Sequence, residues 1–222
     1  MKYKCLVLDH DDTVVNSTAT IHYPCFIEYL KERGSPLAES YTLEEYFVKN
    51  SHPGITAILR DEVGLNDEEI AEEERYWSSY VKNHIPKVYD GLREIMEEFI
   101  SRGGILAVDS HSYSHYIRRD YEANMLPAPH IIYGWDIPPV QRKPSPYTLH
   151  DLMKRYSLEP SEVLVVDDLK PGYDMARAAG VSFAAAGWAY DVPKIESFMR
   201  RGCDYYLKTT LDLRRVLFEE TE

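Results

Sequence analysis

The residues of this chain best suited to chemistry stand directly after its first apolar run. The segment CLVLDHDDTVVNS, residues 5–17, places Asp9, Asp11 and Asp12 within four positions. Carboxylates this close repel one another, so the arrangement is unfavourable unless something positive lies among them. The rest of the sequence must therefore supply, or create a site for, a positive charge at this point.

Other polar residues also follow apolar runs. Ser110 lies in VDSHS, Lys143 lies in QRKPSPYTL just before an expected helix, and Asp167 and Asp168 end VLVVDD. Carboxylate oxygens gathered at one edge of a sheet suit Mg²⁺, whereas a hydroxyl and a lysine suit a bound phosphate. The neighbouring Asp109 competes with Ser110 for this position, and the strand register favours Ser110. Together these residues predict a site for a phosphate and a divalent cation.

Apolar strands alternate with amphipathic helices through most of the chain, which is typical of a parallel sheet covered by helices on both faces. In such sheets ligands bind beyond the carboxyl ends of the strands, so Asp9, Ser110 and Asp168 should meet in one crevice. We expect a Rossmann-like α/β core. Its strands are expected at 3–8, 105–110, 130–134, 163–168, 182–187 and 204–208, and its helices at 91–104, 113–125, 145–157, 171–179 and 192–201.

Residues 15–88 have a different character. They contain helical patterns and acidic clusters, with no convincing strand. Short helices are expected at 42–50 and 54–64, and Asn66 is placed to cap a longer helix over 67–83. We therefore predict a core domain of residues 1–14 and 89–222 with a helical cap domain, residues 15–88, inserted into it.

Composition restricts the possible partners. The 222 residues carry a net charge of −12 with no basic block, which argues against nucleic acid and anionic membrane surfaces as partners. The three cysteines are odd in number and lack metal-site spacing, so we expect reduced thiols in a cytoplasmic protein. No apolar stretch approaches the roughly 18 residues of a membrane span. We expect a monomer or a weak dimer.

The motifs taken together resemble those of a known family. The order D-x-D-x-T, strand-end serine, K-P, and paired acids in DDLKPGYDMARAAG resembles the haloacid dehalogenase superfamily over nearly the whole chain. Within it, the sequence looks like the branch of phosphoglycolate phosphatases and beta-phosphoglucomutases, which carries a helical cap after the first motif. Three positions depart from the usual pattern: His10 replaces an apolar residue, His111 an asparagine, and Leu169 a serine.

The resemblance implies roles for individual residues. Asp9 would be the nucleophile that accepts the phosphoryl group, and Asp11 the general acid and then the general base. Asp9, the backbone carbonyl of Asp11 and Asp168 would bind Mg²⁺, with Asp167 acting through water. Ser110 and Lys143 would hold the phosphoryl oxygens.

Two histidines and one carboxylate lie outside these direct roles. Asp167, His10 and His111 are assigned to the surroundings of the site or to substrate contact. For His10 the sequence leaves packing and substrate contact equally open.

The main prediction is a Mg²⁺-dependent phosphatase acting on a small phosphorylated metabolite. A phosphomutase of the beta-phosphoglucomutase type shares every catalytic residue and is the closest alternative. A dehalogenase is disfavoured because halide departure needs no proton from Asp11. A receiver domain of a signalling protein also clusters acids at strand ends, but its lysine follows all its acids, whereas Asp167 and Asp168 follow Lys143 here.

Overall fold

The computed structural model describes residues 1–219 of the chain. The chain folds into two compact units, one formed by Met1–Asn16 with the chain from Lys87 onward, and the other by Ser17–Pro86. The second unit is therefore inserted into the first. It is shorter at each end than the predicted insert of residues 15–88, because residues at both crossings pair with each other in the first unit.

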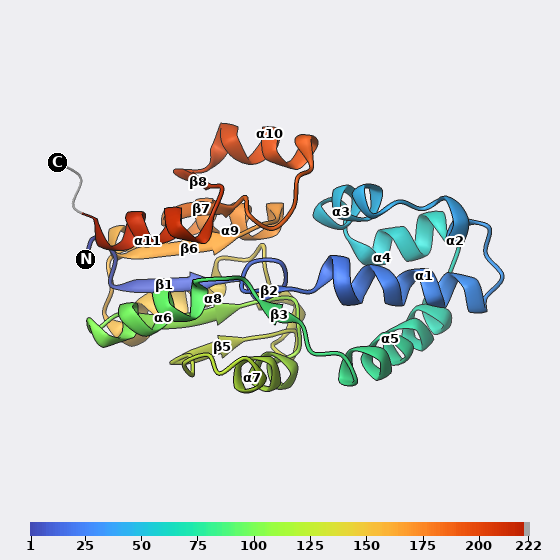
Figure 1. The fold of residues 1–222 in the computed structure, drawn as a ribbon, viewed down its shortest axis with the longest axis horizontal. Coiled ribbons are helices and arrows are strands. Elements are labelled where there is room, and N and C mark those ends of the chain that lie inside the picture. Colours follow the sequence, from blue (N-terminus) through green and yellow to red (C-terminus); the bar gives the residue numbers. More distant parts are fainter. Residues whose placement is uncertain (220–222) are drawn as a thin grey trace. The chain divides into compact units, whose positions relative to one another are not determined.

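The first unit contains a six-stranded parallel sheet (Figure 1). The strand order is β5-β4-β1-β6-β7-β8, so the first strand of the chain lies in the middle. The strands are β1 (Cys5–Leu8), β4 (Ile105–Asp109), β5 (Ile131–Tyr133), β6 (Val163–Asp167), β7 (Ser182–Ala186) and β8 (Tyr205–Leu207). All four residues of β1 are buried, as expected of a central strand covered on both faces.

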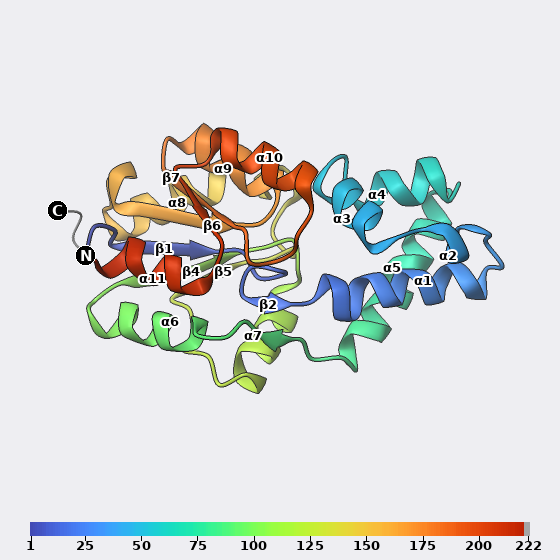
Figure 2. The same ribbon diagram turned by 45° about the horizontal axis from the view of Figure 1, so that its top comes forward.

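Helices cover the two faces of this sheet. Figure 2 shows α6 and α11 on one side of it and α8 and α9 on the other. The helices of this unit are α6 (Leu92–Ser101), α7 (Ser114–Ala123), α8 (Tyr147–Tyr156), α9 (Lys170–Ala179), α10 (Pro193–Gly202) and α11 (Thr210–Phe218). The predicted fold class, a doubly covered parallel sheet with a helical insertion, is confirmed.

The alternation of side chains along the strands decides which helices each residue meets. Leu6 and Leu8 of β1 belong to one apolar cluster with residues of α6 and α11. Val7, which lies between them in sequence, points to the opposite face. This alternation carries over to the polar residues that follow the strands.

The second unit is helical and has its own core. Its helices are α1 (Tyr23–Glu32), α2 (Leu37–Ser40), α3 (Leu43–Ser51), α4 (Ile55–Ala57) and α5 (Asp67–Lys82), with π-helical turns at Thr18–His22 and Ile58–Glu62. The core is rich in aromatic residues, among them Phe26, Tyr29, Tyr41 and Tyr46. The expected helix over 54–64 is thus divided into α4 and a π-helical turn.

The expected cap of α5 is present. The Asn66 side chain accepts hydrogen bonds from the backbone N–H groups of Glu68 and Glu69, and Glu69 bonds back to the Asn66 N–H. This reciprocal pair of bonds fixes the beginning of the helix.

The prediction that residues 15–88 contain no strand was wrong. Val15–Asn16 (β2) pairs antiparallel with Lys87–Val88 (β3), so the two crossings between the units are joined as a short ribbon. Strands of two residues are too short to show the alternating pattern by which strands are found in a sequence. Within residues 1–219, no helix has both the length and the apolar character of a membrane-spanning segment.

Candidate active site

The strand register brings the acidic residues to one level of the sheet. Leu8 at the end of β1 lies beside Val108 of β4 and Val166 of β6. The next residue on each strand is an aspartate: Asp9, Asp109 and Asp167. The three aspartates occupy equivalent positions in the alternation of side chains along their strands. Their side chains therefore lie on the same face of the sheet, the face covered by α8 and α9.

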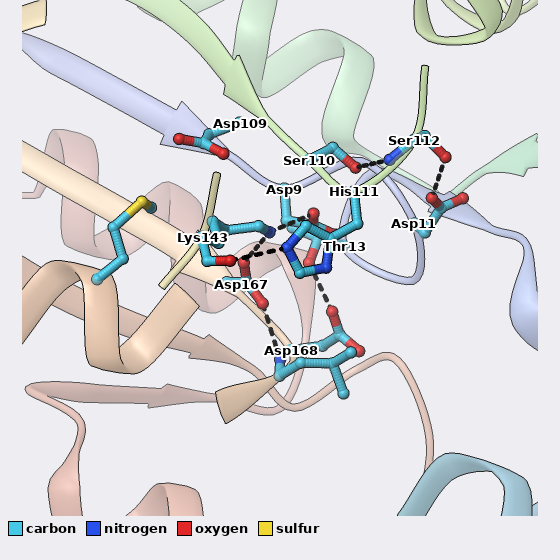
Figure 3. Close-up of polar contacts among 12 residues, drawn as sticks. Asp9, Asp11, Thr13, Asp109, Ser110, His111, Ser112, Lys143, Asp167 and Asp168 are labelled. Atoms are coloured by element: carbon cyan, nitrogen blue, oxygen red, sulfur yellow. Dashed lines mark hydrogen bonds and ion pairs between the residues drawn. The ribbon is translucent and has the colours of Figure 1, made fainter. Parts of the chain in front are cut away.

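Lys143 joins two of these carboxylates. Its ammonium lies 2.7 Å from Asp9 Oδ1 and 2.6 Å from Asp167 Oδ2 (Figure 3). All three side chains are at most 7% exposed. A basic side chain thus supplies part of the positive charge that the crowded acids of the first motif require.

Burial and charge act in opposite directions on this group. Burial raises the pKa of Asp9, the contact with Lys143 opposes that rise, and the net pKa is about 7. Burial alone would lower the pKa of Lys143, but Asp167 and Asp9 reverse this, so the lysine stays protonated. One ammonium does not fully compensate the carboxylates around it, and a bound divalent cation would lower the pKa of Asp9 further.

The donor set fits a hard divalent cation. One carboxylate oxygen from each of Asp9, Asp167 and Asp168 can be chosen so that all three lie within 4.8 Å of one another. Ligand oxygens around a six-coordinate Mg²⁺ are about 3 to 4 Å apart, so only a small contraction is needed. Burial is the main cause that raises the pKa of Asp168, and the charge of Asp167 adds to the rise. Both effects are expected where carboxylates are crowded together.

Asp168 is oriented by two hydroxyl groups. Thr13 Oγ1 donates to its Oδ1 over 3.3 Å, and the Tyr190 hydroxyl donates to its Oδ2 over 3.0 Å. Thr13 is the threonine of the D-x-D-x-T motif, which gave a visible signal. Tyr190 lies in an irregular segment after β7, and no sequence pattern indicated it.

Asp11 points away from the carboxylate group. Its Oδ2 accepts a short hydrogen bond from the Ser112 hydroxyl, whose own backbone N–H donates to Ser110 Oγ (Figure 3). Asp11 is partly exposed, whereas Asp9 is buried. The two acids of the motif therefore have different surroundings, and a separate carboxyl near the surface is suited to proton transfer. Ser112 was not predicted.

Ser110 and Asp109 have different surroundings, although they are adjacent. Asp109 lies beneath the site, where it accepts a short hydrogen bond from Thr148 of α8. Burial raises the pKa of Asp109 to about 6, and Lys143 opposes this rise. Ser110 follows β4 and is joined to Ser112. Ser110, rather than Asp109, remains the residue predicted to contact a bound phosphate.

His111 contacts the backbone of the segment that carries Lys143. Its Nε2 lies 3.1 Å from the Lys143 backbone oxygen. Because a carbonyl oxygen accepts only, this nitrogen carries the proton, and the imidazole fixes the Lys143 segment beside the strand-end serine.

Gly172 lets α9 approach the site closely. A side chain carbon built on it would lie 2.1 Å from Asp167 Oδ2. The glycine of DDLKPG therefore provides the space that the carboxylate occupies.

His10 does not face this site. Its side chain is 1% exposed, and its Nε2 lies 3.1 Å from Asp120 Oδ2 of α7. The sequence left open whether His10 packs in the interior or contacts the substrate, and in the structure it packs in the interior.

Comparison with known proteins agrees with the motifs. The profile of the family described as haloacid dehalogenase-like hydrolase matches residues 6–186, most of the chain. This protein belongs to that family. The match includes the first motif, the Ser110 segment, Lys143 and the paired acids at the end of β6.

Curated relatives of the family have phosphatase names. The phosphoglycolate phosphatase of Pseudomonas savastanoi pv. phaseolicola is 27% identical over 85% of this chain and 71% of its own length. The phosphoglycolate phosphatase of Haemophilus influenzae is 26% identical over 88% of this chain and 92% of its own length. The prediction of a phosphatase of the haloacid dehalogenase type is confirmed.

Solved structures share the fold. A family hydrolase of Deinococcus radiodurans, solved with bound phosphate and sodium, covers 98% of this chain with 96% of its own, a TM-score of 0.74 and 20% identity. A family protein of Streptococcus pneumoniae gives a TM-score of 0.74 at 19% identity, over 96% of this chain and 97% of its own.

Proposed function

We propose that this protein is a Mg²⁺-dependent phosphatase that hydrolyses a small phosphorylated metabolite through an aspartyl phosphate on Asp9. The observation that supports this most strongly is the difference between the two acids of the first motif. Asp9 is buried against Lys143 beside two further carboxylates, whereas Asp11 is partly exposed and bonded to Ser112. Hydrolysis of an alkyl phosphate through a phosphorylated carboxylate uses one acid of each kind, a nucleophile and a proton donor.

In the first step an Asp9 carboxylate oxygen attacks phosphorus, and the bond from phosphorus to the ester oxygen breaks. Asp11 gives its proton to that departing oxygen, so the product leaves as an alcohol. Lys143 and Ser110 hold the phosphoryl oxygens and compensate their charge. The products of this step are the alcohol, ionised Asp11 and phosphorylated Asp9.

In the second step water attacks the phosphorus of phosphorylated Asp9. Ionised Asp11 accepts the proton of that water, and the bond from phosphorus to Asp9 breaks. Inorganic phosphate leaves, and both carboxyl groups return to their starting states. The Ser112 hydrogen bond holds Asp11 in one orientation for both transfers.

Asp9, Asp168 and the Asp11 backbone carbonyl would hold Mg²⁺, with Asp167 acting through water. When bound, the ion supplies positive charge that shields the anionic phosphate from the anionic nucleophile. Carboxylate and carbonyl oxygens are the ligands this ion prefers. The donor atoms of Asp9, Asp167 and Asp168 described above fit such a group.

We assign the choice of substrate to the helical unit Ser17–Pro86, as a cap domain. The phosphatase names of the curated relatives favour hydrolysis over a phosphomutase reaction. The three cysteines, all unpaired, suit a reducing compartment such as the cytoplasm.

Steady-state hydrolysis of nitrophenyl phosphate tests the proposed function. We expect no turnover after treatment with a chelator and full turnover when Mg²⁺ is titrated back. A panel of phosphorylated metabolites then identifies the substrate class. Undiminished turnover in excess chelator would contradict the metal requirement, and absence of turnover with every ester and Mg²⁺ would contradict the phosphatase itself.

A further inference from the structure

His10 separates the two acids of the first motif and is anchored in the protein interior. Its Nε2 lies 3.1 Å from Asp120 Oδ2, and the side chains of both residues are at most 5% exposed. Asp120 belongs to α7, more than one hundred residues away in sequence. The contact therefore joins the loop after β1 to a helix that carries no other residue of the proposed mechanism.

The protonation pattern of this contact follows from its partners. Asp120 Oδ1 accepts hydrogen bonds from Arg119 Nε at 2.8 Å and Arg119 Nη2 at 2.6 Å. The Asp120 carboxylate thus acts as an acceptor toward the guanidinium, and its second oxygen is available as an acceptor as well. His10 Nε2–H is therefore the donor of this hydrogen bond, and Asp120 Oδ2 is the acceptor.

The other ring nitrogen of His10 gains nothing from its position. His10 Nδ1 is buried and has no hydrogen-bond partner. The ring also lies 5.9 Å, between centroids, from Tyr121 of α7. An apolar residue, as is usual at this position in the family it resembles, would avoid the cost of burying polar atoms. The hydrogen bond to Asp120 is what the histidine adds.

The backbone around His10 explains what this bond can control. The His10 carbonyl accepts from the N–H groups of Val14 at 2.9 Å and Val15 at 3.1 Å, which closes the turn. The Asp9 N–H donates to Val166 of β6 at 2.9 Å. The main chain is thus fixed on both sides of His10, and its side chain provides a third attachment. His10 lies at a bend directly between Asp9 and Asp11, so anchoring its side chain restrains the backbone that carries both acids.

We propose that Asp120 is a positioning residue, which acts through His10 to hold the proposed nucleophile Asp9 and the proposed acid Asp11 in their orientations. Apolar packing at this site would restrain the loop without direction, whereas a hydrogen bond fixes both distance and angle. The proposal rests on the proposed function, because it concerns the geometry of the same reaction. Arg119 contributes by holding the Asp120 carboxylate.

Three variants test this proposal. Asp120→Leu leaves the His10 N–H without a partner, Asp120→Asn keeps an oxygen that can accept from it, and the double variant His10→Leu/Asp120→Leu removes both polar groups. The control is Asp204→Leu, which removes a carboxylate that accepts from Arg177 at 3.0 Å and from the Phe183 N–H at 2.8 Å. Phe183 lies near the amino end of β7, away from the strand ends that carry the site.

The readouts are kcat, KM and Tm with nitrophenyl phosphate, at saturating Mg²⁺ and well below every Tm. We expect Asp120→Leu to lower kcat about 10- to 100-fold with KM changed less than about threefold, because misplacement by about 1 Å has costs of this size. Asp120→Asn should lose less. The double variant should recover most of the lost Tm, because removing both partners of a buried hydrogen bond leaves no unpaired group, whereas its kcat should stay about as low as that of Asp120→Leu, because no directional bond then holds the loop. The control should lower Tm and leave kcat unchanged.

Several outcomes would overturn the proposal. These are an Asp120→Leu protein with a lowered Tm but a wild-type kcat, a KM that rises as much as kcat falls, or a double variant whose kcat returns to the wild-type value. If Asp120→Leu does not fold, Asp120→Asn and the double variant decide by the same criteria. Wild-type turnover is measured first, so an inactive wild type contradicts the proposed function, whereas an active wild type with an indifferent Asp120 contradicts this inference alone.

Discussion

Buried carboxyl groups occur in both units, under different conditions. In the first unit Asp9, Asp167 and Asp168 are buried together beside Lys143 at the strand ends. In the second unit Glu73 of α5 is 8% exposed and makes no ion pair within residues 1–219. Burial raises the pKa of Glu73 to about 7, and the neighbouring Glu74 adds to the rise.

The difference shows how a protein tolerates buried acids. A lone carboxyl such as Glu73 can take up a proton, so the unit avoids most of the cost of an unpaired charge. The group around Lys143 retains charge that one ammonium compensates only in part. Such an arrangement lowers the stability of the folded state, and we attribute its presence to the chemistry of phosphoryl transfer. Removal of a carboxylate should therefore abolish activity at the first site and leave activity unchanged at the second.

The largest effect is expected for Asp9→Asn. Without the nucleophile, kcat should fall by at least about 10⁴-fold, since removal of a nucleophile has costs of this order. Stability in chelator should rise, on the order of 1 kcal/mol, because one of several repelling carboxylates is gone. Activity assays and thermal unfolding check the two parts. An active or strongly destabilised variant would contradict the comparison.

Lys143→Met should affect both activity and stability. It leaves the carboxylates without their buried partner, and breaking such a pair by removing one member costs roughly 3–5 kcal/mol. Turnover should fall on the order of 10²-fold or more, because phosphoryl charge is no longer compensated. Lys4→Met serves as the control, since Lys4 is 66% exposed in its pair with Glu162. Equal losses of stability in the two variants would show that burial of the Lys143 group is unimportant.

Glu73→Gln should stabilise the protein without changing turnover of nitrophenyl phosphate. The folded state holds the Glu73 proton up to a pH of about 7, whereas the usual pKa is 4.5. The stabilisation that protonated Glu73 gives the wild-type protein is therefore fully present below pH 4.5. It is lost as the pH rises from 4.5 through 7. The gain from Glu73→Gln should be absent at pH 4.5 and reach on the order of 3 kcal/mol above pH 7.

Urea unfolding at several pH values measures this gain. Glu72→Gln is the matched control, because Glu72 precedes Glu73 in the same helix and is exposed. The control should show no gain that depends on pH. A gain of equal size at pH 4.5 and pH 8 would show that Glu73 is ionised throughout, and the contrast between the two units would then be lost.

Much of the fold followed from patterns in the sequence. The alternation of apolar strands with amphipathic helices predicted the parallel sheet, and the sheet then brought Asp9, Ser110 and Asp168 to one edge. Helix α11 was not predicted, although Thr209 and Asp212 form a capping box that was visible in the sequence. The β2–β3 ribbon has too few residues for any pattern.

The parts of the site that were missed share a physical cause. Ser112, Tyr190 and Asp120 contact motif residues by hydrogen bonds between segments distant in sequence. Such contacts depend on the packing of whole helices and loops, and the residue types are common at unrelated positions. Thr13 was recognisable because it belongs to the motif itself.

The most direct test of the account is a pre-steady-state experiment on Asp11→Asn with nitrophenyl phosphate. Nitrophenolate leaves without a proton, so this variant should still transfer the phosphoryl group to Asp9 and then stop, because no base activates water. We predict a burst of about one nitrophenol per enzyme and a phosphate adduct on Asp9 by mass spectrometry. Asp9→Asn should give no burst. Steady turnover of Asp11→Asn at the wild-type rate, without an adduct on Asp9, would contradict the roles of both acids.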